Sequence, residues 1–112
     1  MLLLKNGQIL EQGVLVQKDL LIEGEKITKI ADSIENVEAK VLDLKGKFIS
    51  PGFIDVHVHW REPGFEYKET IYHASRAAAR GGFTTAMPMP NLNPVPDCYE
   101  NLKLQLDIIE RD

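Results

Sequence analysis

The chain has 112 residues, of which 44% are hydrophobic and 27% are charged, and its formal net charge is −4. This mild acidity argues against a nucleic-acid-binding protein, which needs a clustered basic face. No stretch approaches the ~18 apolar residues of a membrane span, and Lys5-Asn6-Gly7 interrupts the apolar start before a signal-peptide core could form. The single cysteine, Cys98, excludes an internal disulfide. We therefore expect a cytoplasmic globular protein without nucleic-acid or membrane partners.

Residues 1–50 read as a small β domain that serves as scaffold. Short β-prone runs occupy residues 2–4, 8–10, 14–16, 20–23, 26–31 and 41–44. The pairs Asn6-Gly7 and Gly24-Glu25 are tight-turn signals. The polar stretch 32–40 is typical of a surface connection. This pattern predicts a small antiparallel sheet.

Residues 51–112 form a second domain in which strands and helices alternate. We predict a strand over 53–59, a helix over 67–80 ended by Gly81-Gly82, and a strand over 83–87. A final helix follows, with Asp97 as its N-cap and Glu100 three residues later. The first helix would have Glu66 and Glu69 near its N-terminus, where the helix dipole favours acidic residues. The second would have one apolar face, formed by Leu102, Leu106 and Ile109. Repeated βα units imply a parallel sheet in an α/β fold.

The strongest chemical signal in this domain is the pair His57 and His59, one residue apart in the first strand. Because side chains alternate along a strand, Asp55, His57 and His59 would share one face, and the apolar residues between them the other. Two imidazoles on one face suit zinc or a neighbouring divalent metal. A bare His-x-His is also compatible with ordinary strand histidines bonded to backbone or water, so the pair alone leaves both interpretations open.

Neighbouring residues favour the metal interpretation. Arg61 follows two residues later, in a loop marked by Pro63 and Gly64, where a cation could hold an anionic substrate group against the metal. Glu62 could also reach the end of the strand where the metal would bind, although loop glutamates are usually solvated. His73 falls inside the predicted helix and is better explained by a surface or packing role.

The motifs resemble those of dihydroorotases, most closely the bacterial type I enzymes of the amidohydrolase superfamily. The resemblance rests on Pro51-Gly-Phe-Ile-Asp-Val-His-Val-His-Trp-Arg-Glu-Pro-Gly64, on Lys68-Glu69-Thr70, on residues 78–85 (Ala-Ala-Arg-Gly-Gly-Phe-Thr-Thr), and on Met89-Pro-Asn91 with Asn93-Pro94. One position departs from the family pattern: Leu92 stands where a threonine usually follows the asparagine.

The resemblance implies zinc-dependent, reversible interconversion of N-carbamoyl-L-aspartate and L-dihydroorotate in pyrimidine synthesis. His57 and His59 would be zinc ligands, with one or two zinc ions per site, and Arg61 and Asn91 would bind the substrate carboxylate. In a TIM barrel these positions fall at the carboxyl ends of the strands, where active sites lie. Family members are expected to form homo-oligomers and to associate with other pyrimidine-pathway enzymes.

Length limits what this chain can do alone. A complete (β/α)₈ barrel takes about 250 residues, so we expect only its first two βα units, preceded by strands of a small β-sandwich. The remaining ligands and the general base would follow Asp112, and the 112 residues alone would be inactive. Two alternatives stay open: another cyclic amidohydrolase, such as a hydantoinase, dihydropyrimidinase or allantoinase, and a stand-alone module without catalysis.

Overall fold

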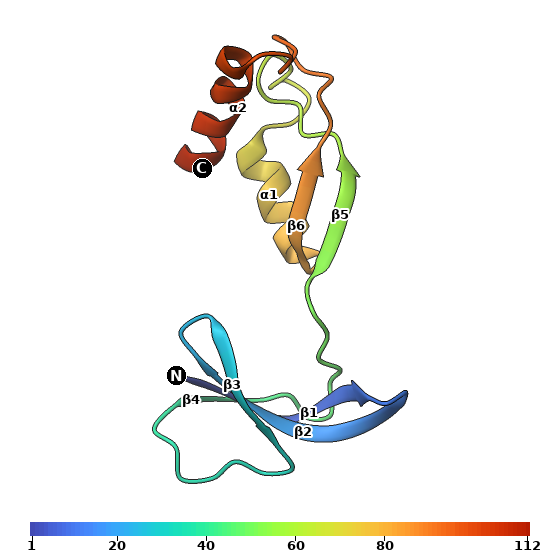
Figure 1. Ribbon diagram of the computed structural model, residues 1–112, viewed down its shortest axis with the longest axis vertical. Helices are drawn as coiled ribbons and strands as arrows, with labels where there is room; N and C mark the ends of the chain where they lie inside the picture. Colours follow the sequence, from blue (N-terminus) through green and yellow to red (C-terminus); the bar gives the residue numbers. More distant parts are fainter. The chain divides into compact units, whose positions relative to one another are not determined.

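The computed structural model describes residues 1–112, which form two compact units, Met1–Pro51 and Gly52–Asp112. Figure 1 labels the eight helices and strands in chain order. Each unit contains its own sheet, so the chain is a mixed α/β protein with two sheets.

The first unit is a four-stranded sheet with the order β3-β2-β1-β4. Its strands are β1 (Leu2–Glu11), β2 (Val14–Glu23), β3 (Lys26–Ala31) and β4 (Lys40–Asp43). The first three pair antiparallel as predicted, but β4 pairs parallel to β1. The β1–β2 turn is formed by Gln12 and Gly13, which both have positive φ, as a primed hairpin turn requires. No turn was predicted at these two residues.

Asn6-Gly7 was wrongly predicted to be a turn between two strands. β1 runs through this pair, and its register against β2 shifts between Leu4 and Gly7. Asn6 adopts a φ of 56°, and its backbone N–H donates to Oδ1 of Asp19 at 2.9 Å. The pair Asn6-Gly7 therefore forms a β-bulge within β1, and the Asn6 N–H finds its acceptor in Asp19.

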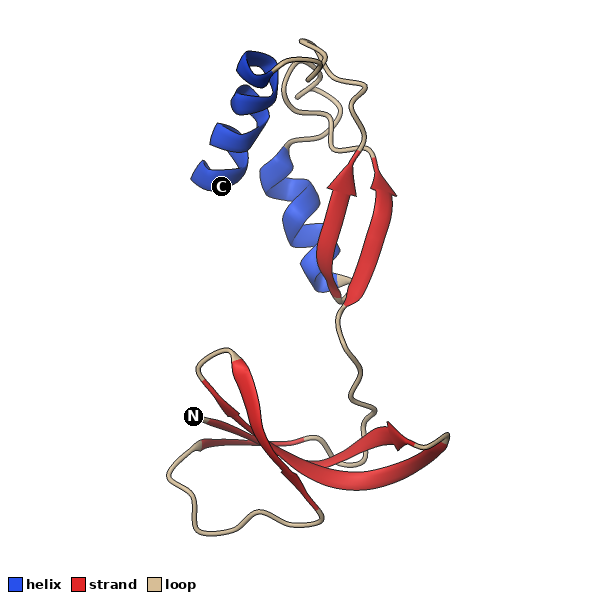
Figure 2. Cartoon of the chain, in the orientation of Figure 1, coloured by secondary structure: helices blue, strands red, loops and turns tan.

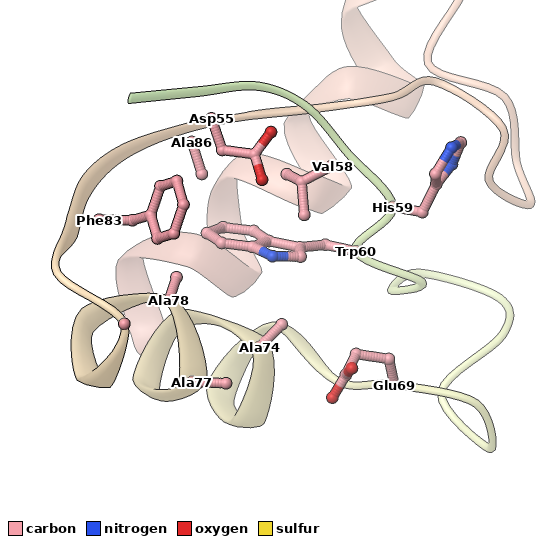
Figure 3. Close-up of a pocket in the computed structure, with 11 residues that line it drawn as sticks. Asp55, Val58, His59, Trp60, Glu69, Ala74, Ala77, Ala78, Phe83 and Ala86 are labelled. Atoms are coloured by element: carbon pink, nitrogen blue, oxygen red, sulfur yellow. The ribbon is translucent and has the colours of Figure 1, made fainter. Parts of the chain in front are cut away.

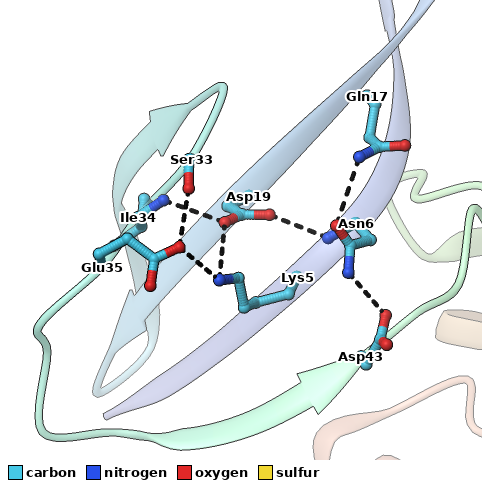
Figure 4. A network of polar contacts seen from close by, with 8 residues as sticks. All are labelled: Lys5, Asn6, Gln17, Asp19, Ser33, Ile34, Glu35 and Asp43. Carbon is cyan, nitrogen blue, oxygen red and sulfur yellow. Dashed lines mark hydrogen bonds and ion pairs between the residues drawn. The ribbon is translucent and has the colours of Figure 1, made fainter.

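One face of this sheet carries a small core formed by Leu3, Leu21 and Ile34. Ile34 is only 1% exposed, so the segment 32–40, predicted to be a surface connection, contributes to the core. Asp19 is buried beside it, 2% exposed, and its Oδ2 accepts the backbone N–H of Ile34 at 3.0 Å (Figure 4). This carboxylate therefore ties the connection to β1 through two backbone donors.

The second unit follows the predicted order of strand, helix, strand and helix. Its elements are β5 (Phe53–Val58), α1 (Ile71–Arg80), β6 (Phe83–Pro88) and α2 (Tyr99–Arg111). β5 and β6 pair in parallel, and the loops that follow them gather at the same end of the sheet (Figure 2). Two strands do not close a barrel.

Both helices begin later than predicted. Helix α1 starts at Ile71, because Thr70 is the N-cap and its Oγ1 accepts the backbone N–H of His73 at 3.3 Å. Helix α2 has Cys98 as its N-cap, and the carboxylate of Asp97 instead accepts the side-chain amide of Asn101 at 3.0 Å. Neither helix is long and apolar enough to cross a membrane.

Several apolar side chains in the second unit have no covering layer. In α2 the predicted stripe of Leu102, Leu106 and Ile109 is 39–48% exposed. In β5, Ile54 and Val56 are 60% and 64% exposed. The amphipathic pattern that predicted these elements is therefore present, but its apolar sides are open in this chain.

Candidate metal and substrate site

The two histidines of the sequence motif lie side by side at the carboxyl end of β5. Their ring centroids are 5.1 Å apart and the ring planes are inclined by 66°. Both side chains are exposed, so the imidazoles are accessible to an ion or small molecule.

Asp55 departs from the predicted alternation of faces. The register of β5 against β6 shifts between Asp55 and Val58, and Oδ1 of Asp55 accepts the backbone N–H of His57 at 3.0 Å. Asp55 lines a cavity of about 260 Å³ together with Val58, His59, Trp60 and alanines of α1. In Figure 3 the indole of Trp60 lies between the strand and α1, whereas the His59 ring is turned away from that helix. The irregular strand thus places Asp55 among residues that pack under α1.

Asn91, which follows β6, meets His59 directly. Nδ1 of His59 and Oδ1 of Asn91 are 3.0 Å apart. An amide oxygen can only accept, so the His59 Nδ1–H donates and Nε2 keeps its lone pair. The backbone N–H of Met89 donates to the Val58 carbonyl at 2.8 Å, which extends the parallel pairing of the strands toward this contact.

Leu92, which departs from the family pattern, has a structural role in the second unit. It is 4% exposed, so the residue next to Asn91 is buried within the second unit. An apolar side chain at this position therefore helps to anchor the loop that carries the amide.

Arg61 lies in the loop after β5, half-buried. Its carbonyl accepts the backbone N–H of Phe65 at 3.0 Å, and none of the ion pairs in the structure involves its guanidinium. No hydrogen bond joins Arg61 to the histidines or to Asn91. The fold thus brings together His57, His59 and Asn91, with Arg61 nearby in sequence.

Glu62 is buried, 8% exposed, and not solvated as the sequence suggested. Its Oε2 accepts the backbone N–H of Ile71, the first residue of α1, at 3.0 Å. Its Oε1 lies 3.6 Å from Nη2 of Arg111 in α2. A carboxylate at a helix N-terminus interacts favourably with the helix dipole. Through the bond to Ile71, Glu62 also connects the loop after β5 to α1. Ile71 lies nine positions after Glu62 in the sequence, so no local capping pattern could have revealed this contact.

The loops after β5 and β6 also pack against each other. Gly64 has a φ of 97°, and a Cβ there would overlap the carbonyl oxygen of Asn93. The backbone N–H of Asn93 donates to the Pro63 carbonyl at 3.2 Å. In addition, Oε1 of Glu66 accepts the backbone N–H of Gly64 at 2.7 Å, and this bond lowers the pKa of Glu66.

The donor set suits zinc in kind but not in number. Two neutral imidazoles are typical zinc ligands, while catalytic zinc usually has three protein ligands. The structure contains no group of three His, Cys, Asp or Glu side chains able to hold a metal. His73 lies on α1, where its Nδ1 is 3.0 Å from Thr70 Oγ1. A metal at this site would need further ligands.

The chain is similar to known proteins in both sequence and fold. The dihydro-orotase-like family model matches residues 46–111. Dihydroorotases of Fusobacterium nucleatum and Staphylococcus aureus are 58% and 54% identical over 111 residues, which cover 99% and 98% of this chain and 26% of each relative.

Among solved structures, the L-hydantoinase (dihydropyrimidinase) of Arthrobacter aurescens superposes with a TM-score of 0.76 at 28% identity, covering 93% of this chain and 24% of that one. The D-hydantoinase (dihydropyrimidinase) of a Thermus species gives 0.76 at 36% identity, covering 96% and 24%.

The fold of this chain matches the N-terminal part of hydantoinase-type amidohydrolases. The chain belongs to the dihydro-orotase-like family, whose model matches more than half of it. It spans about a quarter of the length of the curated relatives that it matches.

Proposed function

We propose that these 112 residues form part of a zinc-dependent dihydroorotase, which interconverts N-carbamoyl-L-aspartate and L-dihydroorotate. The observation that carries the proposal is 58% identity to a dihydroorotase over nearly the whole chain. Residues 51–112 would be the first two βα units of a (β/α)₈ barrel, and residues 1–50 would be strands of a small β-sandwich domain.

In this proposal His57 and His59 hold zinc, and Arg61 and Asn91 bind the substrate carboxylate. Zinc would supply Lewis-acid polarisation of a ring carbonyl and activation of water at neutral pH. In hydrolysis, water adds to the ring carbonyl carbon, the C–N bond breaks, and the released nitrogen takes a proton. The remaining zinc ligands and the general base would come from the longer polypeptide.

A cation two residues after the histidine pair in the sequence and an amide in contact with His59 support an anionic substrate. Arg61 has no carboxylate partner within the chain, and Asn91 contacts His59 through its oxygen alone, which leaves its N–H groups available. Hydantoin and dihydrouracil carry no carboxylate and would not use such donors. This chemistry favours dihydroorotate over the neutral rings of the structurally similar hydantoinases.

The test is a substrate comparison with the complete polypeptide that contains this chain, loaded with zinc. We expect kcat/KM to be highest for L-dihydroorotate, compared with hydantoin, dihydrouracil and allantoin. Preference for a neutral ring would overturn the assignment in favour of another cyclic amidohydrolase. The 112-residue chain, assayed with added zinc, should give no turnover, and robust activity would contradict the need for further ligands.

A further inference from the structure

The contact between Asn91 and His59 uses only half of the asparagine amide. Oδ1 accepts the His59 Nδ1–H at 3.0 Å, and this bond sets which end of the amide faces the ring. The Nδ2 group then has two N–H donors that face elsewhere. One side chain thus offers an acceptor to a histidine and donors to a second partner.

The contact is held by the backbone on both sides. Before Asn91, Met89 pairs with Val58 through a 2.8 Å hydrogen bond, and after it Asn93 pairs with Pro63 at 3.2 Å. Leu92 is buried at 4% exposure. The loop therefore presents the Asn91 amide to His59 as part of the packed structure.

A hydrogen bond at one imidazole nitrogen decides the chemistry of the other. With the proton fixed on Nδ1, the Nε2 lone pair is free for a metal, and such partners of metal-binding histidines raise metal affinity about 10–100-fold. We infer that Asn91 is a positioning residue that selects the Nδ1–H tautomer of His59, while its N–H₂ group stays available for the substrate contact already proposed.

This inference rests on the proposed function only for its substrate half, since the tautomer half concerns the chain alone. It predicts that Asn91→Asp and Asn91→Ala behave differently. An aspartate still accepts from His59 but has no N–H to offer an anion and repels it, whereas alanine removes both interactions.

The first measurement is long-range ¹H–¹⁵N NMR of the histidine rings in the 112-residue chain at a pH of about 8.5, two units above the usual histidine pKa. We expect the Nδ1–H tautomer of His59 in the wild type and in Asn91→Asp, and its loss in Asn91→Ala. Asn93→Ala, from the same loop, is the control and should keep it. A wild-type His59 protonated on Nε2, or no change in Asn91→Ala, would overturn the inference.

The second measurement uses the zinc-loaded complete polypeptide. We expect Asn91→Asp to keep its zinc affinity while KM for dihydroorotate rises at least 10-fold, and Asn91→Ala to lose zinc affinity about 10–100-fold. A wild-type KM in Asn91→Asp would overturn the substrate half. If the wild-type polypeptide itself fails to hydrolyse dihydroorotate, the proposed function fails while the NMR result for His59 still stands.

Discussion

At the scale of single residues, Arg61 is proposed to bind the substrate partly because its guanidinium has no ion-pair partner within the chain. It follows the histidine pair by two residues and has no ion-pair partner within the chain. A guanidinium can bind a carboxylate through two parallel hydrogen bonds, which a lysine cannot reproduce. The sequence identified this candidate without structural help, because the motif places it directly after the ligand pair.

Arg61→Met in the zinc-loaded complete polypeptide should lower kcat/KM for dihydroorotate about 10–100-fold, mainly through KM. The reason is the loss of a charge-assisted hydrogen bond, typically about 1.5–3 kcal/mol. Zinc content should stay normal. Steady-state kinetics on the folded variant checks this, and wild-type kcat/KM would remove Arg61 from the substrate site.

Asp19 shows the opposite case, a buried carboxylate with a structural task. Asp19→Ala would leave the backbone N–H groups of Asn6 and Ile34 without their acceptor. We expect a loss of about 1–3 kcal/mol in the free energy of unfolding of the first unit. Urea unfolding followed by circular dichroism measures it. Asp32→Ala, which removes an exposed partner of Lys18, is the control, and equal losses in both variants would contradict the assignment.

The elements themselves were predictable to different degrees. The order of β5, α1, β6 and α2 was readable from hydrophobic periodicity and from Gly81-Gly82. Their fine structure was not, because it depends on distant partners. Asn6-Gly7 became a bulge since Asp19 accepts the Asn6 N–H from across the sheet, and the buried position of Glu62 depends on the N-terminus of α1. Such contacts leave no local pattern in the sequence.

Gly64 lies against Asn93 of the neighbouring site loop, with no room for a Cβ. Gly64→Ala would force a side chain into a positive φ and into the Asn93 carbonyl, so we expect destabilisation of roughly 1–3 kcal/mol. Gly82→Ala is the matched control, because Gly82 has a φ of 87° but only an ordinary contact with Phe53 at 3.5 Å. Denaturant unfolding followed by Trp60 fluorescence compares them, and a smaller loss at Gly64 than at Gly82 would contradict the packed loops.

The β1–β4 edge should weaken in acid. The Asn6 side-chain amide and then the Lys45 backbone N–H bond to Asp43 and lower its pKa. A lowered folded-state pKa stabilises the fold above the unfolded value of about 4, and this stabilisation is lost as pH falls through the folded value. The protection of the Lys45 amide against hydrogen exchange, taken relative to its intrinsic exchange rate at each pH, should therefore fall below about pH 4. Asp43→Asn should flatten this dependence, and an unchanged pH profile would rule out Asp43 as its source.

For the molecule as a whole, the resemblance to dihydroorotases was readable from several motifs within residues 51–94, and the family match confirms it. The two-sheet α/β organisation was also predictable. Hydrophobic periodicity did not reveal which residues cover the apolar sides of α2 and β5. Those sides are exposed in this chain. We propose that further segments of the longer polypeptide cover them, in keeping with relatives about four times as long as this chain.

We propose that His57 and His59 are metal ligands, and the zinc content of histidine variants tests this. In the complete polypeptide, elemental analysis of purified His57→Ala and His59→Ala should show most of the zinc lost relative to wild type, together with nearly all turnover. His73→Ala, the remaining histidine of this chain, should retain wild-type zinc. Unchanged zinc in both His57→Ala and His59→Ala would contradict the account.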